Sequence, residues 1–147
     1  MVVQLLEQLA VSFVACAAFS LIFGVQKHRL VQCGLVGASG WLAYTVCSML
    51  DMRTIPATLL AVCVVTIISQ IMAKHYRTPI IVFSAAGIIP LVPGKIAYDA
   101  MRHIVQEEYV IAVELAMQAF MISGSIAIGL VFSEVVYLIF RRSPRSS

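Results

Sequence analysis

The chain has 147 residues, of which 61% are hydrophobic and 12% are charged, and its formal net charge at pH 7 is +3. Together with a mean hydropathy of +0.99, this composition excludes a water-soluble enzyme. The charged residues fall in short clusters between long apolar runs, as in chains that cross a bilayer several times. We therefore predict an all-α integral membrane protein in contact with lipid. Because no basic face is visible, we expect no nucleic-acid partner.

Five membrane spans are expected, at about residues 9–25, 30–50, 57–73, 80–93 and 116–140. They form a single transmembrane domain over residues 1–140, followed by a basic cytoplasmic tail over residues 141–147. The first span lies at the lower length limit for crossing the hydrocarbon core. Two small-residue pairs at i,i+4 spacing, Gly34 with Ala38 and Ser39 with Ala43, predict that the second span packs closely against other helices. Ser125 and Gly129 repeat this spacing in the last span.

The fourth span is expected to be broken. Residues 80–92 rise only about 20 Å as a helix, against a hydrocarbon core of about 30 Å. Pro90 and Pro93 each remove a backbone donor, and Gly94 can adopt conformations that other residues avoid, so the helix should break at this Pro-x-x-Pro-Gly motif. An amphipathic helix over about residues 95–108 should follow the break.

The positive-inside rule gives the orientation. Five spans place Lys and Arg of alternate loops on opposite sides, and the two sets contain seven and three residues: Lys27, Arg29, Lys74, Arg77, Arg141, Arg142 and Arg145 against Arg53, Lys95 and Arg102. The N-terminus is therefore expected outside and the C-terminus in the cytoplasm. If the second segment does not insert, four spans with both termini inside remain the alternative.

A binding site is expected at the break, because irregular backbone at membrane depth is tolerated only where it is buried in protein or lines a polar cavity. The first N–H groups of the helix after the break suit a carboxylate, as in other transporters with broken helices. A structural kink without a ligand is the alternative. The candidate substrate-binding residues are Ser84, Gly87, Pro90, Pro93, Gly94, Lys95 and Tyr98.

Gradient-driven transport would also need ionisable groups in the membrane. The candidates for ion or proton coupling are Asp99, Glu114 and Gln118, although Asp99 could be a solvated residue of the amphipathic helix. Gly94-Lys95 lacks the other residues of a phosphate-binding loop, which argues against nucleotide hydrolysis. No hydrolytic motif is present, so an enzyme is not expected. Cys16, Cys33, Cys47 and Cys63 lack metal-ligand spacing and are predicted to be buried small hydrophobes, without a metal or another cofactor.

The stretch from Ile88 to Gly94, with Tyr98, Ala100 and Met101 following, resembles the threonine/serine exporter family, specifically the small membrane subunit of its two-component form. The resemblance implies an inner-membrane exporter component, driven by an ion gradient and working with a larger membrane subunit of the same family. It implies threonine and serine as substrates, with succinate in some two-chain members. Assembly as a homo-oligomer and the identity of the substrate stay open. The alternative function is a non-transporting scaffold or assembly subunit for the larger partner.

Overall fold

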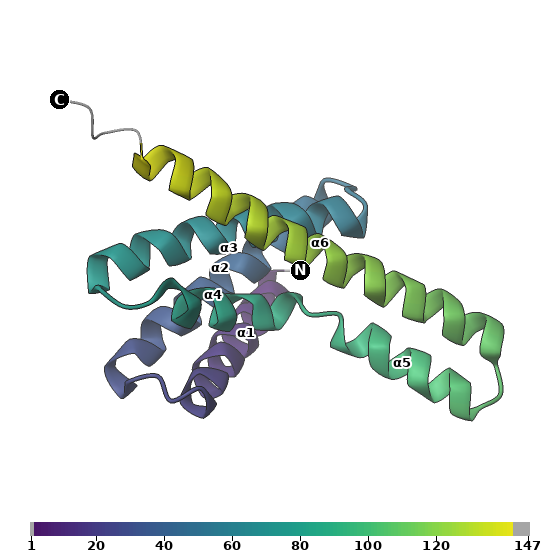
Figure 1. Cartoon of the computed structure of the whole chain (residues 1–147). Helices are drawn as coiled ribbons and strands as arrows, with labels where there is room; N and C mark the ends of the chain where they lie inside the picture. Colours follow the sequence, from purple (N-terminus) through teal and green to yellow (C-terminus); the bar gives the residue numbers. More distant parts are fainter. Residues whose placement is uncertain (1, 143–147) are drawn as a thin grey trace.

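The computed structural model describes residues 2–142, and within them every regular element is a helix (Figure 1). The elements are α1 (Val2–Ile22), η1 (Lys27–Arg29), α2 (Leu30–Met49), α3 (Thr54–Tyr76), α4 (Ile80–Ile88), η2 (Ile89–Leu91), α5 (Gly94–Val105) and α6 (Tyr109–Arg142). Four of these segments are long and apolar enough to cross a membrane, and the bent pair α4/η2 with α5 makes a fifth if it counts as one span. The prediction of an all-α chain with about five spans is confirmed.

Two helices have bounds that differ from those of the spans predicted there. α1 begins at Val2 and ends at Ile22, so the first span lies several residues earlier than expected. Apolar residues before Leu9 extend this helix, and Gly24 ends the turn after it with a φ of 71°. At the other end, α6 begins at Tyr109 and continues to Arg142, so it includes the start of the predicted basic tail. Residues 143–147 of that tail lie outside the described part of the chain.

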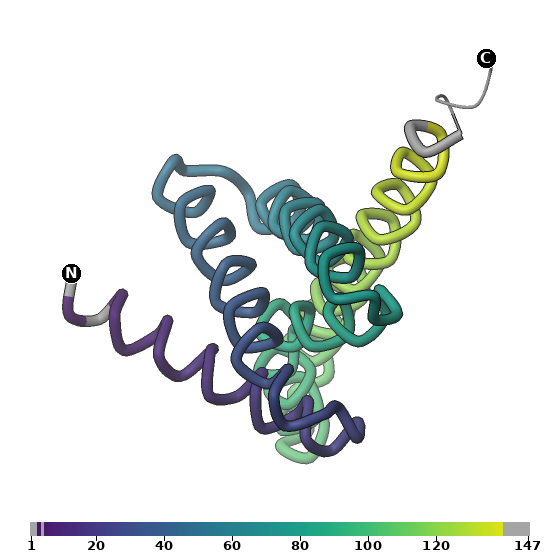
Figure 2. The backbone as a smooth tube through the Cα atoms, turned by 90° about the vertical axis from the view of Figure 1, so that its left-hand side faces the viewer, coloured from purple at the N-terminus to yellow at the C-terminus, as the bar shows by residue number. Residues whose placement is uncertain are grey.

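α2 is the central helix. It packs against α1 on one side and α3 on the other, and α4 lies in contact with both α2 and α3. Seen from the side, the helices fan out from α1 through α2 and α3 to α6 (Figure 2). The central position predicted for the second span is therefore confirmed.

Glycines of α2 allow this close packing, but their spacing differs from the predicted pairs. Gly34, Gly37 and Gly40 are buried, whereas Ala38, Ser39 and Ala43 are half-buried. A Cβ atom added to Gly34 would lie 2.6 Å from the Phe13 ring of α1. The i,i+3 spacing is favoured because α2 must approach α1, α3 and α4 together, which requires small residues over a broader arc than one i,i+4 pair provides.

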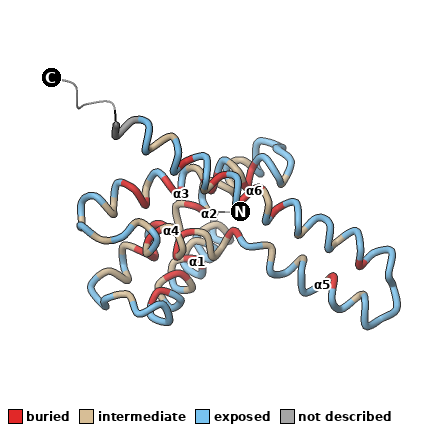
Figure 3. Tube along the Cα trace, in the orientation of Figure 1, coloured by how far each residue is buried: buried red, intermediate tan, exposed pale blue. Residues whose placement is uncertain are grey.

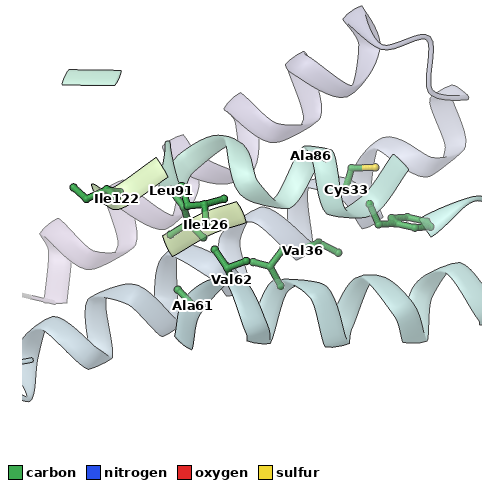
Figure 4. Close-up of a cluster of buried hydrophobic side chains, with 10 residues drawn as sticks. Cys33, Val36, Ala61, Val62, Ala86, Leu91, Ile122 and Ile126 are labelled. Atoms are coloured by element: carbon green, nitrogen blue, oxygen red, sulfur yellow. The ribbon is translucent and has the colours of Figure 1, made fainter. Parts of the chain in front are cut away.

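The hydrophobic core lies where α2, α3, α4, η2 and α6 meet (Figure 4). It consists of ten buried apolar residues: Cys33, Val36, Ala61, Val62, Val65, Phe83, Ala86, Leu91, Ile122 and Ile126. The prediction for the cysteines holds for Cys16 and Cys33, which are buried, while Cys47 and Cys63 are only partly buried. All four are free thiols.

α6 packs on α3 through its middle. Ser125 and Gly129 are both buried, as their spacing predicted, and a Cβ atom added to Gly129 would meet Val62 of α3 at 3.0 Å. Further along the same interface, the Gln70 amide donates a hydrogen bond of 3.2 Å to the backbone carbonyl of Ser133. This bond satisfies one polar group of a side chain that is 8% exposed.

The first half of α6 pairs with α5 to form a hairpin that extends away from the other helices (Figure 1). Most of its residues are exposed (Figure 3). At its tip, His103 Nδ1 and Glu108 Oε2 lie 2.6 Å apart, and Glu107 adopts a left-handed φ of 63°. The contact between His103 and Glu108 and the left-handed turn together reverse the chain between the two helices.

The close approach of α2 and α1 predicts opposite effects for two glycine substitutions. In Gly37→Ala, the new methyl group would overlap the Cys16 Sγ atom and lie 2.9 Å from the Cys16 Cβ atom, whereas nothing lies within 4 Å of a Cβ atom added to Gly124. We expect Gly37→Ala to destabilise the fold by about 1–3 kcal/mol through overpacking. Gly124→Ala should be neutral or slightly stabilising. Heating the detergent-solubilised variants and measuring the fraction that stays monodisperse tests this. Equal stability of the two variants would contradict the packing described here.

Candidate functional site

The chain breaks between α4 and α5, and the two helices are bent by 50° relative to each other. α4 ends at Ile88, and a short 3₁₀ turn over Ile89–Leu91 carries Pro90. Pro93 then adopts φ −76° and ψ 50°, and the Gly94 N–H donates to the Val92 carbonyl at 2.8 Å. This is the geometry of an inverse γ-turn, with the fixed φ of proline at its centre.

Gly94 has a different role from the one expected. It is the first residue of α5. Its φ is not positive, in contrast to that of Gly24. The break therefore does not use the conformational freedom of this glycine. The two prolines account for it, because each removes a backbone donor and restricts the residue before it.

The N-terminus of α5 is left without a side-chain cap. The N–H of Gly94 is bonded within the γ-turn, and the N–H of Ala97 donates to the Pro93 carbonyl at 3.0 Å. The N–H groups of Lys95 and Ile96 lie between these two in the first turn of α5. No carbonyl group of the helix precedes them, so they have no acceptor within the helix. Together with the dipole of α5, they form a local positive pole that favours an anion.

A cavity of about 340 Å³, here called the break cavity, adjoins this helix end. Its volume falls in the range of small-molecule sites, roughly 300–1,000 Å³. Its walls come from α2, the start of α3, the break, the start of α5 and the middle of α6: Trp41, Tyr44, Thr54, Thr58, Pro90, Leu91, Val92, Pro93, Lys95, Ile96 and Ile122. These lining residues carry one cation and several donors but no carboxylate.

Trp41 is the most informative side chain of this wall. Its indole Nε1–H is buried and has no acceptor among the described residues. A buried donor without a partner costs roughly 1–3 kcal/mol, so such a group is expected where a ligand or water can accept its hydrogen bond. The Trp41 ring is tilted against that of Tyr44, with 5.6 Å between the centroids. Beside them, the Thr58 hydroxyl donates to the Thr54 carbonyl at 2.8 Å.

The structure brings three of the predicted substrate-binding residues, Pro90, Pro93 and Lys95, to this cavity. Ser84 and Gly87 lie in α4 and do not line it: the Ser84 hydroxyl donates to the Ile80 carbonyl at 3.1 Å, and Gly87 is buried against Val36 and Val65. Tyr98 lies one turn beyond the break and is 67% exposed.

The predicted coupling residues lie outside the break cavity. Glu114 and Gln118 are exposed on the α5–α6 hairpin, and Asp99 is half-buried on α5. Within residues 2–142, no three His, Cys, Asp or Glu side chains are grouped so that they could hold a metal ion.

Eight of the eleven lining residues were not predicted, and four of these eight carry polar side-chain groups: Trp41, Tyr44, Thr54 and Thr58. The i,i+4 spacing of Thr54 and Thr58 is a weak signal of a polar stripe at the start of α3, and Trp41 is the single tryptophan of the chain. Neither signal connects these residues to the break, because the contact depends on how α2 and α3 pack against α4 and η2.

Several apolar helices of membrane-spanning length define a multi-pass membrane protein, and a broken helix pair lies beside a mainly apolar cavity. The family model described as threonine/serine exporter, ThrE, matches residues 8–136. The chain belongs to this family.

Among curated proteins, an uncharacterized protein of Haemophilus influenzae is 30% identical over 103 residues. The match covers 70% of this chain and 35% of that protein, so this chain spans about a third of its relative's length. No solved structure matches.

If solvent reaches the break cavity, a cysteine at Thr58 should react with a water-soluble methanethiosulfonate. The control is Thr66→Cys on the same helix, because Thr66 is also buried and its hydroxyl also donates to the carbonyl four residues earlier, at 2.8 Å. Both variants are made in a background in which the four native cysteines are replaced by alanine. Thr58→Cys should be labelled much faster than Thr66→Cys in intact membranes. Equal rates would argue against an accessible cavity at the break.

Proposed function

We propose that the chain is a subunit of a gradient-driven secondary transporter that exports small carboxylate-bearing metabolites across the cytoplasmic membrane. Threonine and serine are the first candidates, because the family to which the chain belongs is described as a threonine/serine exporter. Succinate is the second, since the lining of the break cavity offers donors and a cation but no carboxylate to pair with an α-ammonium group.

One observation carries this proposal: groups that attract a carboxylate converge on the break cavity. Lys95 lines it and is the second residue of α5, so its ammonium group and the free N–H groups of Lys95 and Ile96 act at the same end of the helix. Trp41 adds an indole N–H without a partner in the described chain. Pro90 and Pro93 hold the irregular backbone that leaves these donors free.

A larger membrane subunit of the same family is the proposed partner. The relative from Haemophilus influenzae is much longer than the region it shares with this chain, which supports a transporter that needs additional protein. The exposed apolar residues of the α5–α6 hairpin, such as Val110, Val113 and Phe120, offer a surface for such a subunit or for lipid. A homo-oligomer is the other assembly to be tested.

The proposed orientation has the N-terminus outside and the C-terminus in the cytoplasm. Its support is that two basic segments lie at the same end of the bundle. The Arg29 guanidinium donates to the Tyr76 carbonyl at 3.1 Å and lies 4.3 Å from the centre of the Tyr76 ring. The contact between these segments supports placing the clusters around Lys27 and Lys74 on one membrane face, as the proposed orientation needs.

The direct test is efflux of labelled threonine, serine and succinate from cells that express this chain alone, or together with a larger subunit of the same family. We expect export only on co-expression, and the compound that is exported identifies the substrate class. If none of the three is exported while both proteins are present in the membrane, the proposed function is wrong for these substrates.

Two variants test the break cavity within that assay. Trp41→Phe removes the unpartnered donor, and Lys95→Gln removes the cation; each should weaken substrate binding about tenfold or more, because a hydrogen bond to a charged group contributes roughly 1.5–3 kcal/mol. Arg102→Gln is the matched control, since it removes an exposed cation of the same helix away from the cavity. The apparent KM of export is the readout.

The scaffold function makes the opposite prediction. If the break only shapes the contact with the partner, Trp41→Phe and Lys95→Gln will leave export unchanged, and replacement of Pro93 will instead prevent recovery of the assembled complex. Co-purification of the two subunits, measured beside export for each variant, separates the two functions.

A further inference from the structure

Two turns of the chain meet at one end of the helix bundle. The first connects α1, which ends at Ile22, to α2, which begins at Leu30, and the second connects α3, which ends at Tyr76, to α4, which begins at Ile80. The Arg29 guanidinium donates to the Tyr76 carbonyl at 3.1 Å, so the two turns are in direct contact. Together they carry six basic residues, which we call the basic end: Lys27, His28, Arg29, Lys74, His75 and Arg77.

The protein itself does not neutralise the basic end. η1, α2, α3, α4 and the two turns contain no Asp or Glu. α6, which also packs on α3, carries Glu134. Within residues 2–142, however, the contact between His103 and Glu108 on the distant hairpin is the only one between a basic and an acidic side chain at salt-bridge distance. The charge of the basic end is therefore available to an anion from outside the chain.

Arg29 is the cation of the basic end that is held in a fixed position. Its guanidinium lies 4.3 Å from the centre of the Tyr76 ring, and that ring packs against the hydrophobic core. The Nε atom of Arg29 is buried and has no acceptor in the described part of the chain. A planar guanidinium binds a phosphate group through two parallel hydrogen bonds, and a side chain that is already ordered loses less entropy on binding.

Exposed apolar side chains lie beside these cations on all four helix ends. They are Ile22 and Phe23 at the end of α1, Val31 at the start of α2, Ile71 near the end of α3 and Ile81 at the start of α4. α1, α2 and α3 are each long and apolar enough to cross a membrane, and α4 belongs to the bent pair that makes a further span. A ligand with an anionic head and apolar tails matches both features, whereas a free phosphate ion matches only the first.

We propose that the basic end binds the headgroup of an anionic phospholipid such as phosphatidylglycerol. The Arg29 guanidinium binds the phosphate group, Lys27 and Lys74 add positive charge from the two turns, and the acyl chains lie along the exposed apolar side chains. Basic groups between membrane helices bind anionic headgroups in this way. One bound lipid then connects the α1–α2 hairpin to the α3–α4 turn. This site does not depend on the proposed export function.

The test uses the full chain in phosphatidylcholine vesicles, with a fluorescent reporter at the basic end. Trp41→Phe removes the single tryptophan, and Phe23→Trp introduces an exposed one beside the cations. Quenching by brominated phosphatidylglycerol, compared with brominated phosphatidylcholine of the same acyl chains, gives the relative binding constant of the two lipids. We expect phosphatidylglycerol to bind roughly tenfold more tightly or better. A reporter at Leu50→Trp, at the opposite end of α2, should show no such preference.

Further variants identify the residues that bind the headgroup. Arg29→Lys keeps the charge but loses the planar fork, and it should lower the preference by about threefold or more. The double variant Lys27→Gln with Lys74→Gln leaves the contact between Arg29 and Tyr76 intact and should also lower the preference severalfold. Arg53→Gln is the matched control, because it removes an exposed cation at the other end of α3. It should bind lipid like the wild type.

Three results would overturn the proposal. The first is equal quenching of the Phe23→Trp reporter by the two lipids. The second is a full preference in Arg29→Lys that disappears at about 1 M salt, where the Debye length is about 3 Å, because this is the behaviour of a diffuse charged surface without a site. The third is displacement of brominated phosphatidylglycerol by millimolar inorganic phosphate, which would assign the basic end to small anions. Lipid binding is measured without export, so none of these results bears on the proposed function.

Discussion

The fold depends on two proline rings at positions 90 and 93. Each removes a backbone donor from a segment that would otherwise continue α4, and an interruption at membrane depth survives only where protein or polar cavity replaces the lost partners. The γ-turn at Pro93 and the 3₁₀ turn at Ile89–Leu91 satisfy part of the backbone. Leu91 is buried in the core and anchors the break between α2 and α3. The uncapped start of α5 and the break cavity beside it follow from this interruption.

Much of the fold could be predicted from local sequence. Apolar runs and charged clusters gave the number and order of the helices, because both are properties of short segments. Helix ends were less accurate, since they depend on single residues in unusual conformations: Asp51 and Arg77, with φ values of 55° and 51°, follow α2 and α3 although neither is glycine. The spacing of the small residues in α2 differs from the predicted one, because the glycines make room for three neighbouring helices at once.

The candidate site was only half predictable. Pro90, Pro93 and Lys95 form one continuous motif, so sequence reasoning found them. Trp41 and Thr58 reach the same cavity from α2 and α3, and no local pattern ties them to residues more than thirty positions later.

α6 also constrains how the protein sits in its bilayer. Its 34 residues are about 51 Å long, whereas a hydrocarbon layer of about 30 Å accommodates only about 39 Å of a helix tilted by about 40°, the upper end of the usual range. About eight residues, or two turns, must therefore stand outside the hydrocarbon at one or both ends. A thicker membrane would draw more of the helix inside and a thinner one would expose more. Lipid thickness thereby sets how much of α6 stands outside the hydrocarbon at one or both of its ends.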